Sequence, residues 1–169
     1  NAVRDQLILS SKVFNPVGDG VNDRGLSRRH IFRQVEASLR RLGAERLDMY
    51  LIHEPDPETP LEETLRALDD LVRQGKLHYL GASNMPGWLM TKALWMSDKY
   101  NLHHFEWVQN SYSLLDRGDE KEVLPLCADQ GLGYTPFSPL AGGWLTGKYT
   151  STADFPAGSQ MTLRPEPYE

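Results

Sequence analysis

The sequence has little cysteine and no long apolar run, and both shortages narrow the kind of protein that it encodes. Cys127 is the only cysteine, so an internal disulfide is excluded. It lies in the apolar pattern VLPLCADQGLG, which favours packing in a core over a role as a nucleophile. No stretch approaches the roughly 18 consecutive apolar residues of a membrane span, and no charged-then-apolar leader opens the chain. We therefore expect a cytoplasmic protein that does not enter a membrane.

Positive charge is also scarce. Lysine and arginine number 18 against 23 aspartates and glutamates, which gives a formal net charge of -5. The basic residues are spread along the chain and form no stripe that would neutralise nucleic-acid phosphates, so we expect no nucleic-acid partner. With 169 residues, of which 40% are apolar, the chain can bury a core, and we expect a single domain over residues 1–169.

The apolar residues that are present alternate between two periodicities. Short runs rich in β-branched and aromatic residues predict strands at 6–13, 47–53, 77–83, 105–110 and 133–138. Helical spacing predicts four helices between them. Their apolar positions are Ile31, Val35, Leu39 and Leu42; Leu61, Leu65, Leu68 and Val72; Leu89, Ala93, Leu94 and Met96; and Val123, Leu124 and Cys127. At the second helix, Thr59 is predicted as the N-cap, Pro60 as the first helical residue and Glu62 as the third. Gly43, Gly75 and Gly131 are predicted to end helices.

Strict alternation of strand and helix predicts a parallel sheet. A doubly wound sheet that binds a dinucleotide would show G-x-G-x-x-G after its first strand, and the segments GDGVND and GLGYTP each lack the third glycine. A (β/α)₈ TIM barrel needs no such fingerprint and takes about 250 residues. We therefore predict an α/β fold of the TIM-barrel type, of which this chain covers about five βα units.

Polar residues stand where the predicted strands end, which is where a barrel carries its chemistry. They are Lys12, His53, Ser83 with Asn84, Gln109 with Asn110, and Ser138. Each also has a plain structural interpretation. His53 can bond to a neighbouring backbone group, Lys12 can be a surface lysine, and SNMP is good turn chemistry. A lysine in a barrel mouth is nevertheless costly to desolvate unless it has a partner or a task.

Two other motifs carry less weight. GGWLTGKY, residues 142–149, matches a phosphate loop except that Tyr149 stands where serine or threonine would bind magnesium. His103 and His104 have no third ligand at metal spacing, so we expect a polar loop there and no metal site.

An ordered set of motifs resembles the aldo-keto reductases, (β/α)₈ enzymes that use a nicotinamide cofactor. The motifs are LILSSKV, DMYLIHEPD, YLGASN, WVQNSYSLLDR and YTPFSPLAGGWLTGKY, and the match runs from about Asp5 to Tyr149. The resemblance implies hydride transfer between NADPH and a carbonyl carbon, with a tyrosine as proton donor. It assigns Lys12 and His53 to the catalytic tetrad, whose aspartate and tyrosine would precede residue 1.

The resemblance also implies a set of cofactor contacts. Ser83, Asn84 and Gln109 match residues that hold the nicotinamide carboxamide, and Phe137 matches an aromatic residue that stacks on the ring. Further matches are the loop Ser138, Pro139, Leu140, Ala141 and Gly142, and the basic Lys148. Gln160 stands where related sequences often carry an arginine, which puts one phosphate contact in question.

Three functional alternatives remain open at this point. The first is an NADP-dependent reductase of small carbonyl substrates. The second is a cofactor-binding regulatory subunit of the channel β-subunit type, in which asparagine replaces the strand-terminal histidine that this chain keeps as His53. The third is an inactive portion of such a barrel. Because an open sheet leaves apolar surface exposed, we also expect a homo-oligomer.

Overall fold

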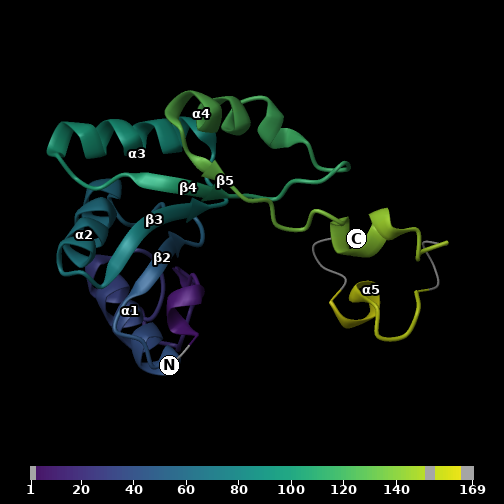
Figure 1. Ribbon diagram of the computed structural model, residues 1–169, viewed down its shortest axis with the longest axis horizontal. Helices are drawn as coiled ribbons and strands as arrows, with labels where there is room; N and C mark the ends of the chain where they lie inside the picture. Colours follow the sequence, from purple (N-terminus) through teal and green to yellow (C-terminus); the bar gives the residue numbers. More distant parts are fainter. Residues whose placement is uncertain (1–2, 151–154, 165–169) are drawn as a thin grey trace.

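The computed structural model describes residues 3–150 and 155–164, and its centre is a parallel five-stranded sheet with helices on one face (Figure 1). The strands are β1 (Ser10–Val13), β2 (Leu47–Ile52), β3 (Leu77–Ser83), β4 (Phe105–Gln109) and β5 (Gly133–Tyr134). They lie in the sheet in chain order, and each neighbouring pair is parallel. The predicted alternation of strand and helix is confirmed.

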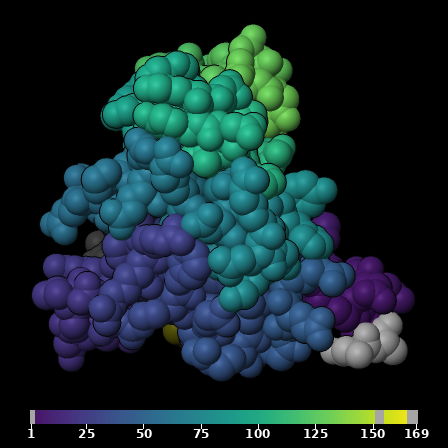
Figure 2. All heavy atoms as spheres, turned by 90° about the vertical axis from the view of Figure 1, so that its left-hand side faces the viewer, coloured from purple at the N-terminus to yellow at the C-terminus, as the bar shows by residue number. Residues whose placement is uncertain are grey.

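One helix follows each of the first four strands, and a short fifth helix and turns of 3₁₀ helix make up the other helical parts of the described residues. The helices are α1 (Arg28–Leu42), α2 (Leu61–Arg73), α3 (Gly87–Tyr100), α4 (Val123–Gln130) and the short α5 (Gln160–Leu163). Turns of 3₁₀ helix are η1 (Arg4–Gln6), η2 (Gly118–Glu120) and η3 (Ala141–Thr146). Space-filling atoms show α1 to α4 as one layer, coloured from purple and blue to green as the chain runs (Figure 2). In the part of the chain that the structure describes, none of these helices has both the length and the apolar character needed to cross a bilayer.

The helix ends follow from capping chemistry, with one correction. Ser27 caps α1, since its Oγ accepts a hydrogen bond from the His30 amide at 3.3 Å. Gly43 and Gly131 end their helices in the left-handed region, at φ 60° and 67°. The prediction for α2 was wrong by one residue, because Pro60 and not Thr59 is the N-cap. The Thr59 hydroxyl instead donates to Asp56 Oδ2 at 2.8 Å.

Two predicted strands are shorter than expected. The first, predicted over 6–13, begins at Ser10, because the Leu9 amide donates to the Asp48 carboxylate at 2.7 Å instead of to a backbone carbonyl. The last, predicted over 133–138, stops at Tyr134. Pro136 has no N–H to donate to the ladder, although the Phe137 amide reaches the Asn110 carbonyl at 2.9 Å.

The core lies between the sheet and the helices. Tyr50, Ile52, Leu80 and Val108 point from the sheet into this layer, and all are buried. Tyr50 therefore faces the helices, as expected for a residue three positions from His53, and burial raises the pKa of its hydroxyl.

Cys127 packs in the same layer, and burial raises the pKa of its thiol. Its predicted place in the core is confirmed.

The opposite face of the sheet, called here the inner face, carries Met49, Leu51, Tyr79, Gly81 and Trp107. A Cβ at Gly81 would lie 3.0 Å from Leu51 Cγ and 3.1 Å from Trp107 Cε3, so this position suits glycine. Helices α1 to α4 all lie on the other side (Figure 1). Tyr79 is 56% exposed and borders a cavity of about 560 Å³. Around Tyr79 the inner face therefore has an apolar surface that the described residues leave open to solvent, whereas Leu51, Gly81 and Trp107 are buried.

We expect this surface to cause self-association of the 169-residue chain, because a large exposed apolar patch commonly pairs with another chain. Tyr79→Gln should lower the average mass of the chain in sedimentation-velocity experiments. Trp95→Gln, which removes a 58% exposed aromatic ring from α3, is the matched control and should leave it unchanged. A monomeric wild-type chain, or equal effects of both changes, would contradict this expectation.

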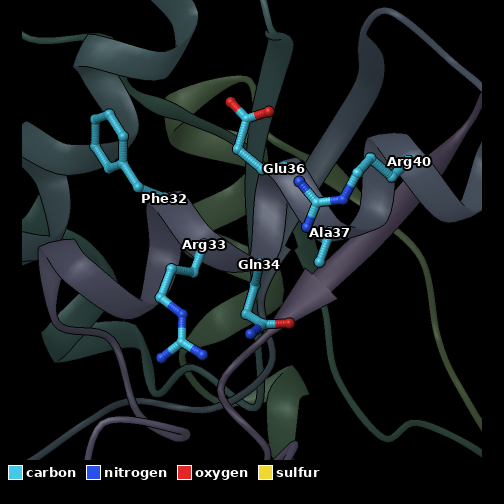
Figure 3. Close-up of a pocket in the computed structure, with 6 residues that line it drawn as sticks. All are labelled: Phe32, Arg33, Gln34, Glu36, Ala37 and Arg40. Carbon is cyan, nitrogen blue, oxygen red and sulfur yellow. The ribbon is translucent and has the colours of Figure 1, made fainter.

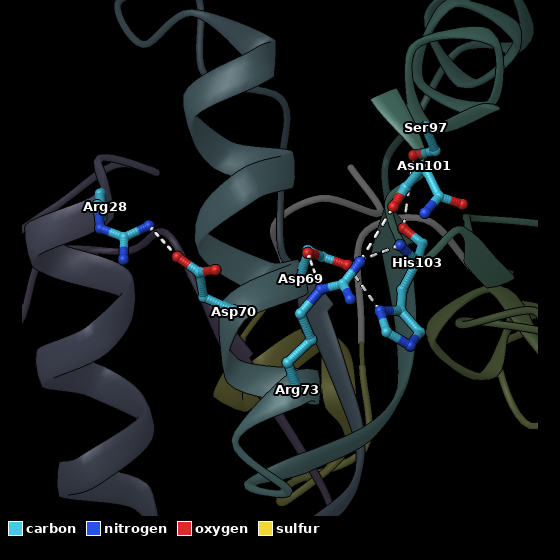
Figure 4. A network of polar contacts seen from close by, with 7 residues as sticks. All are labelled: Arg28, Asp69, Asp70, Arg73, Ser97, Asn101 and His103. Atoms are coloured by element: carbon cyan, nitrogen blue, oxygen red, sulfur yellow. Dashed lines mark hydrogen bonds and ion pairs between the residues drawn. The ribbon is translucent and has the colours of Figure 1, made fainter. Parts of the chain in front are cut away.

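A buried carboxylate joins α2 to the segment before β4 (Figure 4). Asp69 accepts bonds from Arg73 Nε at 2.6 Å and from the His103 amide at 2.9 Å, and its Oδ1 lies 2.6 Å from His103 Nδ1. Arg73 also donates to the Asn101 carbonyl at 3.0 Å. Burial would raise the pKa of Asp69, but these donors outweigh burial and lower it.

The neighbouring histidine uses a different carboxylate, since His104 Nε2 lies 2.8 Å from Asp98. The two histidines thus contact two different carboxylates.

Asp69→Asn should lower the free energy of unfolding at pH 7 by about 1–3 kcal/mol, since the amide cannot satisfy three donors. A carboxyl with a lowered folded pKa stabilises the fold above its unfolded pKa of about 3.9 and loses that contribution as pH falls through the folded pKa. The difference between wild type and Asp69→Asn should therefore shrink in acid, as measured by urea denaturation.

The neighbouring Asp70→Asn is the control, because Asp70 pairs with Arg28 on an exposed surface and should cost about 0–1 kcal/mol. Equal losses for both variants at pH 7 would show that Asp69 does not hold the two segments together.

Candidate active site

The polar residues predicted at the strand ends lie along one edge of the sheet. Parallel register pairs Lys12 with Leu51, Leu51 with Gly81, and Ser83 with Gln109. His53 follows Ile52, whose partner is Ala82, so His53 is level with Ser83. Lys12, His53, Ser83 and Gln109 therefore share the carboxyl-terminal edge of β1 to β4.

Lys12 is tied into this edge through Ser83. Its Nζ donates to Ser83 Oγ at 3.3 Å, and Ser83 Oγ donates in turn to the Gln109 carbonyl at 2.7 Å. Ser83 is fully buried, so its hydroxyl is occupied from both sides within the protein. Burial lowers the pKa of Lys12, because the charged ammonium loses contact with water there.

His53 is held at three points. Its amide donates to the Val13 carbonyl at 2.8 Å, and its carbonyl accepts from Asn84 Nδ2 at 2.9 Å. Its ring Nδ1 lies 3.0 Å from Asn15 Nδ2. Burial lowers the pKa of His53 and the charge of Lys12 lowers it further, while Glu54 opposes both. The imidazole is therefore mainly neutral at pH 7, with one N–H to donate.

The turn after β3 fixes Asn84 in a strained conformation. Asn84 has φ 53°, and its amide donates to the Gln109 carbonyl at 3.3 Å. Asn110 braces the turn, because its Oδ1 accepts from the Met85 amide at 3.1 Å and its Nδ2 donates to the Met85 carbonyl at 3.2 Å. Sequence reasoning placed Asn110 at the strand end but did not foresee this reciprocal, buried amide pair.

Beside this edge lies a cavity of about 680 Å³. Its walls include Asn84, Phe137, Ser138 and Ala141 among the predicted site residues. The structure thus brings the end of β3 together with the segment that follows β5. Gln109 belongs to the same edge, where its Nε2 lies 3.5 Å from Thr135 Oγ1.

The segment after Phe137 is rich in left-handed backbone. Ser138 has φ 57°, Ala141 47°, Gly142 64° and Gly143 105°. Strained conformations of this kind gather at binding sites, where the surrounding structure must hold them. Gly143, at φ 105°, has a backbone conformation that residues with a side chain rarely adopt, and this favours glycine there.

An aromatic cluster that sequence reasoning missed holds this segment. The rings of Trp144, Tyr149 and Phe155 pack edge to face, with centroids 5.2 to 5.8 Å apart. The Tyr149 hydroxyl donates to the Gly142 carbonyl at 3.0 Å. The same motif that resembles a phosphate loop, GGWLTGKY, contains two of these aromatics.

Other predicted contacts do not line this cavity, namely Ser83, Gln109, Pro139, Leu140, Gly142 and Lys148. Pro139 and Leu140 are exposed, and the ammonium of Lys148 stands over the Tyr149 ring at 5.0 Å. Gln160 donates to the Arg164 carbonyl at 2.9 Å. Arg164 itself borders the cavity, so an arginine is present near the position where Gln160 lacks the charge.

Another hollow, of about 400 Å³, lies on the outer surface of α1 (Figure 3). Phe32, Arg33, Gln34, Glu36, Ala37 and Arg40 border it. Arg33 bonds to Asp23 and Glu36 pairs with Lys76, so part of its charge serves ion pairs between elements. This hollow is separate from the strand-end edge.

The chain is thus an α/β protein in which a parallel sheet carries a lysine, a histidine and amide groups at its carboxyl-terminal edge. A sequence model of the aldo/keto reductase family matches residues 1–165, and the chain belongs to that family. The family has a (β/α)₈ barrel and uses nicotinamide cofactors. The five parallel strands and their helices correspond to part of that barrel.

Individual relatives agree with this membership. The chain is 43% identical over 149 residues to an uncharacterised oxidoreductase, YrpG, of Bacillus subtilis, covering 86% of this chain and 46% of that protein. It is 42% identical over 134 residues to a versiconal hemiacetal acetate reductase of Aspergillus parasiticus, covering 79% and 39%. It is 39% identical over 161 residues to a probable voltage-gated potassium channel β subunit of Arabidopsis thaliana, covering 95% and 48%. The chain thus spans less than half the length of each of these three relatives.

Proposed function

We propose that the protein to which this chain belongs is an NADP-dependent reductase of small aldehydes and ketones. The observation that carries the proposal is the pairing at the sheet edge, where Lys12 and a mainly neutral His53 end adjacent strands. Membership of the aldo/keto reductase family supports it.

The residues present fit a nicotinamide cofactor. The cavity of about 680 Å³ is large enough for part of a dinucleotide, and Phe137 offers an apolar ring at its wall. The strained backbone from Ser138 to Gly143 lets the main chain approach a ligand closely. A bound nicotinamide would supply the hydride for the reaction. Asn84, Gln109 and Phe137 would hold the ring, and Ser138 to Gly142 with Lys148 would serve the rest of the molecule.

Within this set we distinguish the role of Ser83. Cofactor binding by Ser83 stays a prediction from the family resemblance. Its contacts favour a positioning role, because its hydroxyl already accepts from Lys12 and donates to the Gln109 carbonyl.

The two catalytic residues would divide the proton chemistry. A phenol has a pKa of about 10, and a nearby ammonium makes it a stronger acid by favouring the phenolate. Lys12 would do this for the family tyrosine. His53 would donate its N–H to the carbonyl oxygen as negative charge develops there, as an oxyanion hole does.

A regulatory role is the second candidate, because one relative is named a channel β subunit. The resemblance gives such subunits an asparagine where this chain has His53, and this favours the enzyme. Turnover by the whole protein decides between the two.

His53→Ala in the whole protein should lower kcat for aldehyde reduction by about 10²-fold or more, since oxyanion contacts contribute that much. His104→Ala is the control, because His104 pairs with Asp98 on the outside and should leave kcat unchanged. Steady-state NADPH oxidation gives the measurement. Wild-type turnover in His53→Ala would exclude the assignment.

The 169-residue chain alone should not turn over carbonyl substrates. In the family the donor tyrosine precedes the lysine, whereas all seven tyrosines here follow Lys12. Tyr50 is buried toward the helices, and the hydroxyls of Tyr112 and Tyr134 bond to Glu120 and Asp119. Tyr168 lies outside the described residues.

The assay uses the purified chain with NADPH and methylglyoxal. Turnover clearly above a control without protein would show that another group donates the proton.

A further inference from the structure

We propose that Asn15 is a positioning residue that fixes the tautomer of His53, holding its proton on Nε2 by donating a hydrogen bond to Nδ1. This inference deepens the proposed function and rests on it for its catalytic meaning. Its structural content, the protonation of the two ring nitrogens, can be tested separately.

The contact itself dictates the direction of the bond. Asn15 Nδ2 lies 3.0 Å from His53 Nδ1. An amide nitrogen of asparagine can only donate, so Nδ1 must accept with its lone pair. A neutral imidazole carries one proton, which then resides on Nε2, at the opposite side of the ring. His53 therefore presents a donor, and not an acceptor, to whatever lies beyond Nε2.

The backbone before Asn15 holds this residue beside His53. Phe14 has φ 150°, a conformation that costs energy in a residue with a side chain. Its carbonyl accepts from the Gly25 amide at 2.7 Å, and its ring packs partly against the core. The carbonyl and the ring of Phe14 thus hold its strained backbone in place. This conformation places the next residue, Asn15, beside His53.

The far end of the same loop is bonded to the segment that follows β2 and contains His53. The Leu26 amide donates to Asp56 Oδ2 at 2.7 Å, and Asp56 lies three residues after His53. The Val17 amide donates to the Asp23 carbonyl at 2.9 Å, which closes the loop on itself. Residues 14–26 therefore form one unit that is anchored beside the histidine.

The charged groups around His53 affect which protonation state of its ring is favoured, and their net effect, with burial, favours the neutral form. Lys12, on β1, disfavours the imidazolium, and Glu54, the next residue along the chain, favours it. A donor at Nδ1 stabilises the neutral form, because only the neutral ring has a lone pair there. Asn15 thus acts in the same direction as Lys12.

Two substitutions at Asn15 test the bond by changing its polarity. Asn15→Ala removes the donor and should raise the pKa of His53. Asn15→Asp places an acceptor at Nδ1, so it should raise the pKa further and move the proton of the neutral ring to Nδ1. Nitrogen-15 NMR of the whole protein with labelled histidine measures both the pKa of His53 and the ring nitrogen that carries the proton. The His53 signals are identified by their loss in His53→Gln.

Asn22→Ala is the matched control, since Asn22 belongs to the same loop but its described bond is made by its backbone carbonyl, which accepts from His30 Nδ1. It should leave the His53 signals unchanged. A wild-type His53 protonated on Nδ1, or an unchanged pKa in both Asn15 variants, would overturn the proposal.

Kinetics separates this inference from the proposed function. If both hold, Asn15→Ala lowers kcat by roughly 10-fold or more with little change in KM, as orienting partners of a functional imidazole commonly contribute. Asn15→Ser, which keeps a donor, should recover part of the loss. If the NMR results hold but His53→Ala retains full turnover, the bond exists and the proposed function is wrong.

Discussion

Parallel pairing in one register is the constraint on which the site depends. Because Ile52 pairs with Ala82 and Ser83 pairs with Gln109, residues far apart in sequence end their strands at the same level. A slip of one residue would turn each side chain to the other face of the sheet. Lys12 would then meet the buried helical layer, where an ammonium has no partner. The core on the outer face therefore fixes the geometry of the polar edge.

Hydrogen bonds between strand ends hold the polar residues of this edge in place. Ser83 links Lys12 to the backbone of β4, and Asn84 links the backbone of His53 to the end of β3. These bonds join the end of β3 to β1, to β4 and to the residue after β2, so neighbouring strand ends help to hold both catalytic candidates. Among the described non-glycine residues with positive φ, Asn101 ends α3, whereas Phe14, Asn84, Ser138 and Ala141 lie beside the edge or the cavity.

Two aromatic groups illustrate how context decides what a side chain does. Tyr50 and Tyr79 both lie on strands, and only the alternation of the pleat separates them. Tyr50 is fully buried against the helices, whereas Tyr79 borders the open cavity of the inner face. Neither is within the strand-end edge, so a tyrosine in the chain is not by itself a proton donor.

Periodicity and capping chemistry determined the order of strands and helices, because apolar residues recur every two or three to four positions whatever surrounds them. The same patterns located Lys12, His53, Ser83 and Gln109 at strand ends. Only the tertiary structure decided their partners. The bond between Asn15 and His53 spans 38 positions, and that between Lys12 and Ser83 spans 71. Such contacts depend on strand register and loop conformation, which local sequence does not encode. Thr59 failed as the predicted cap for the same reason, since Asp56 competed for its hydroxyl.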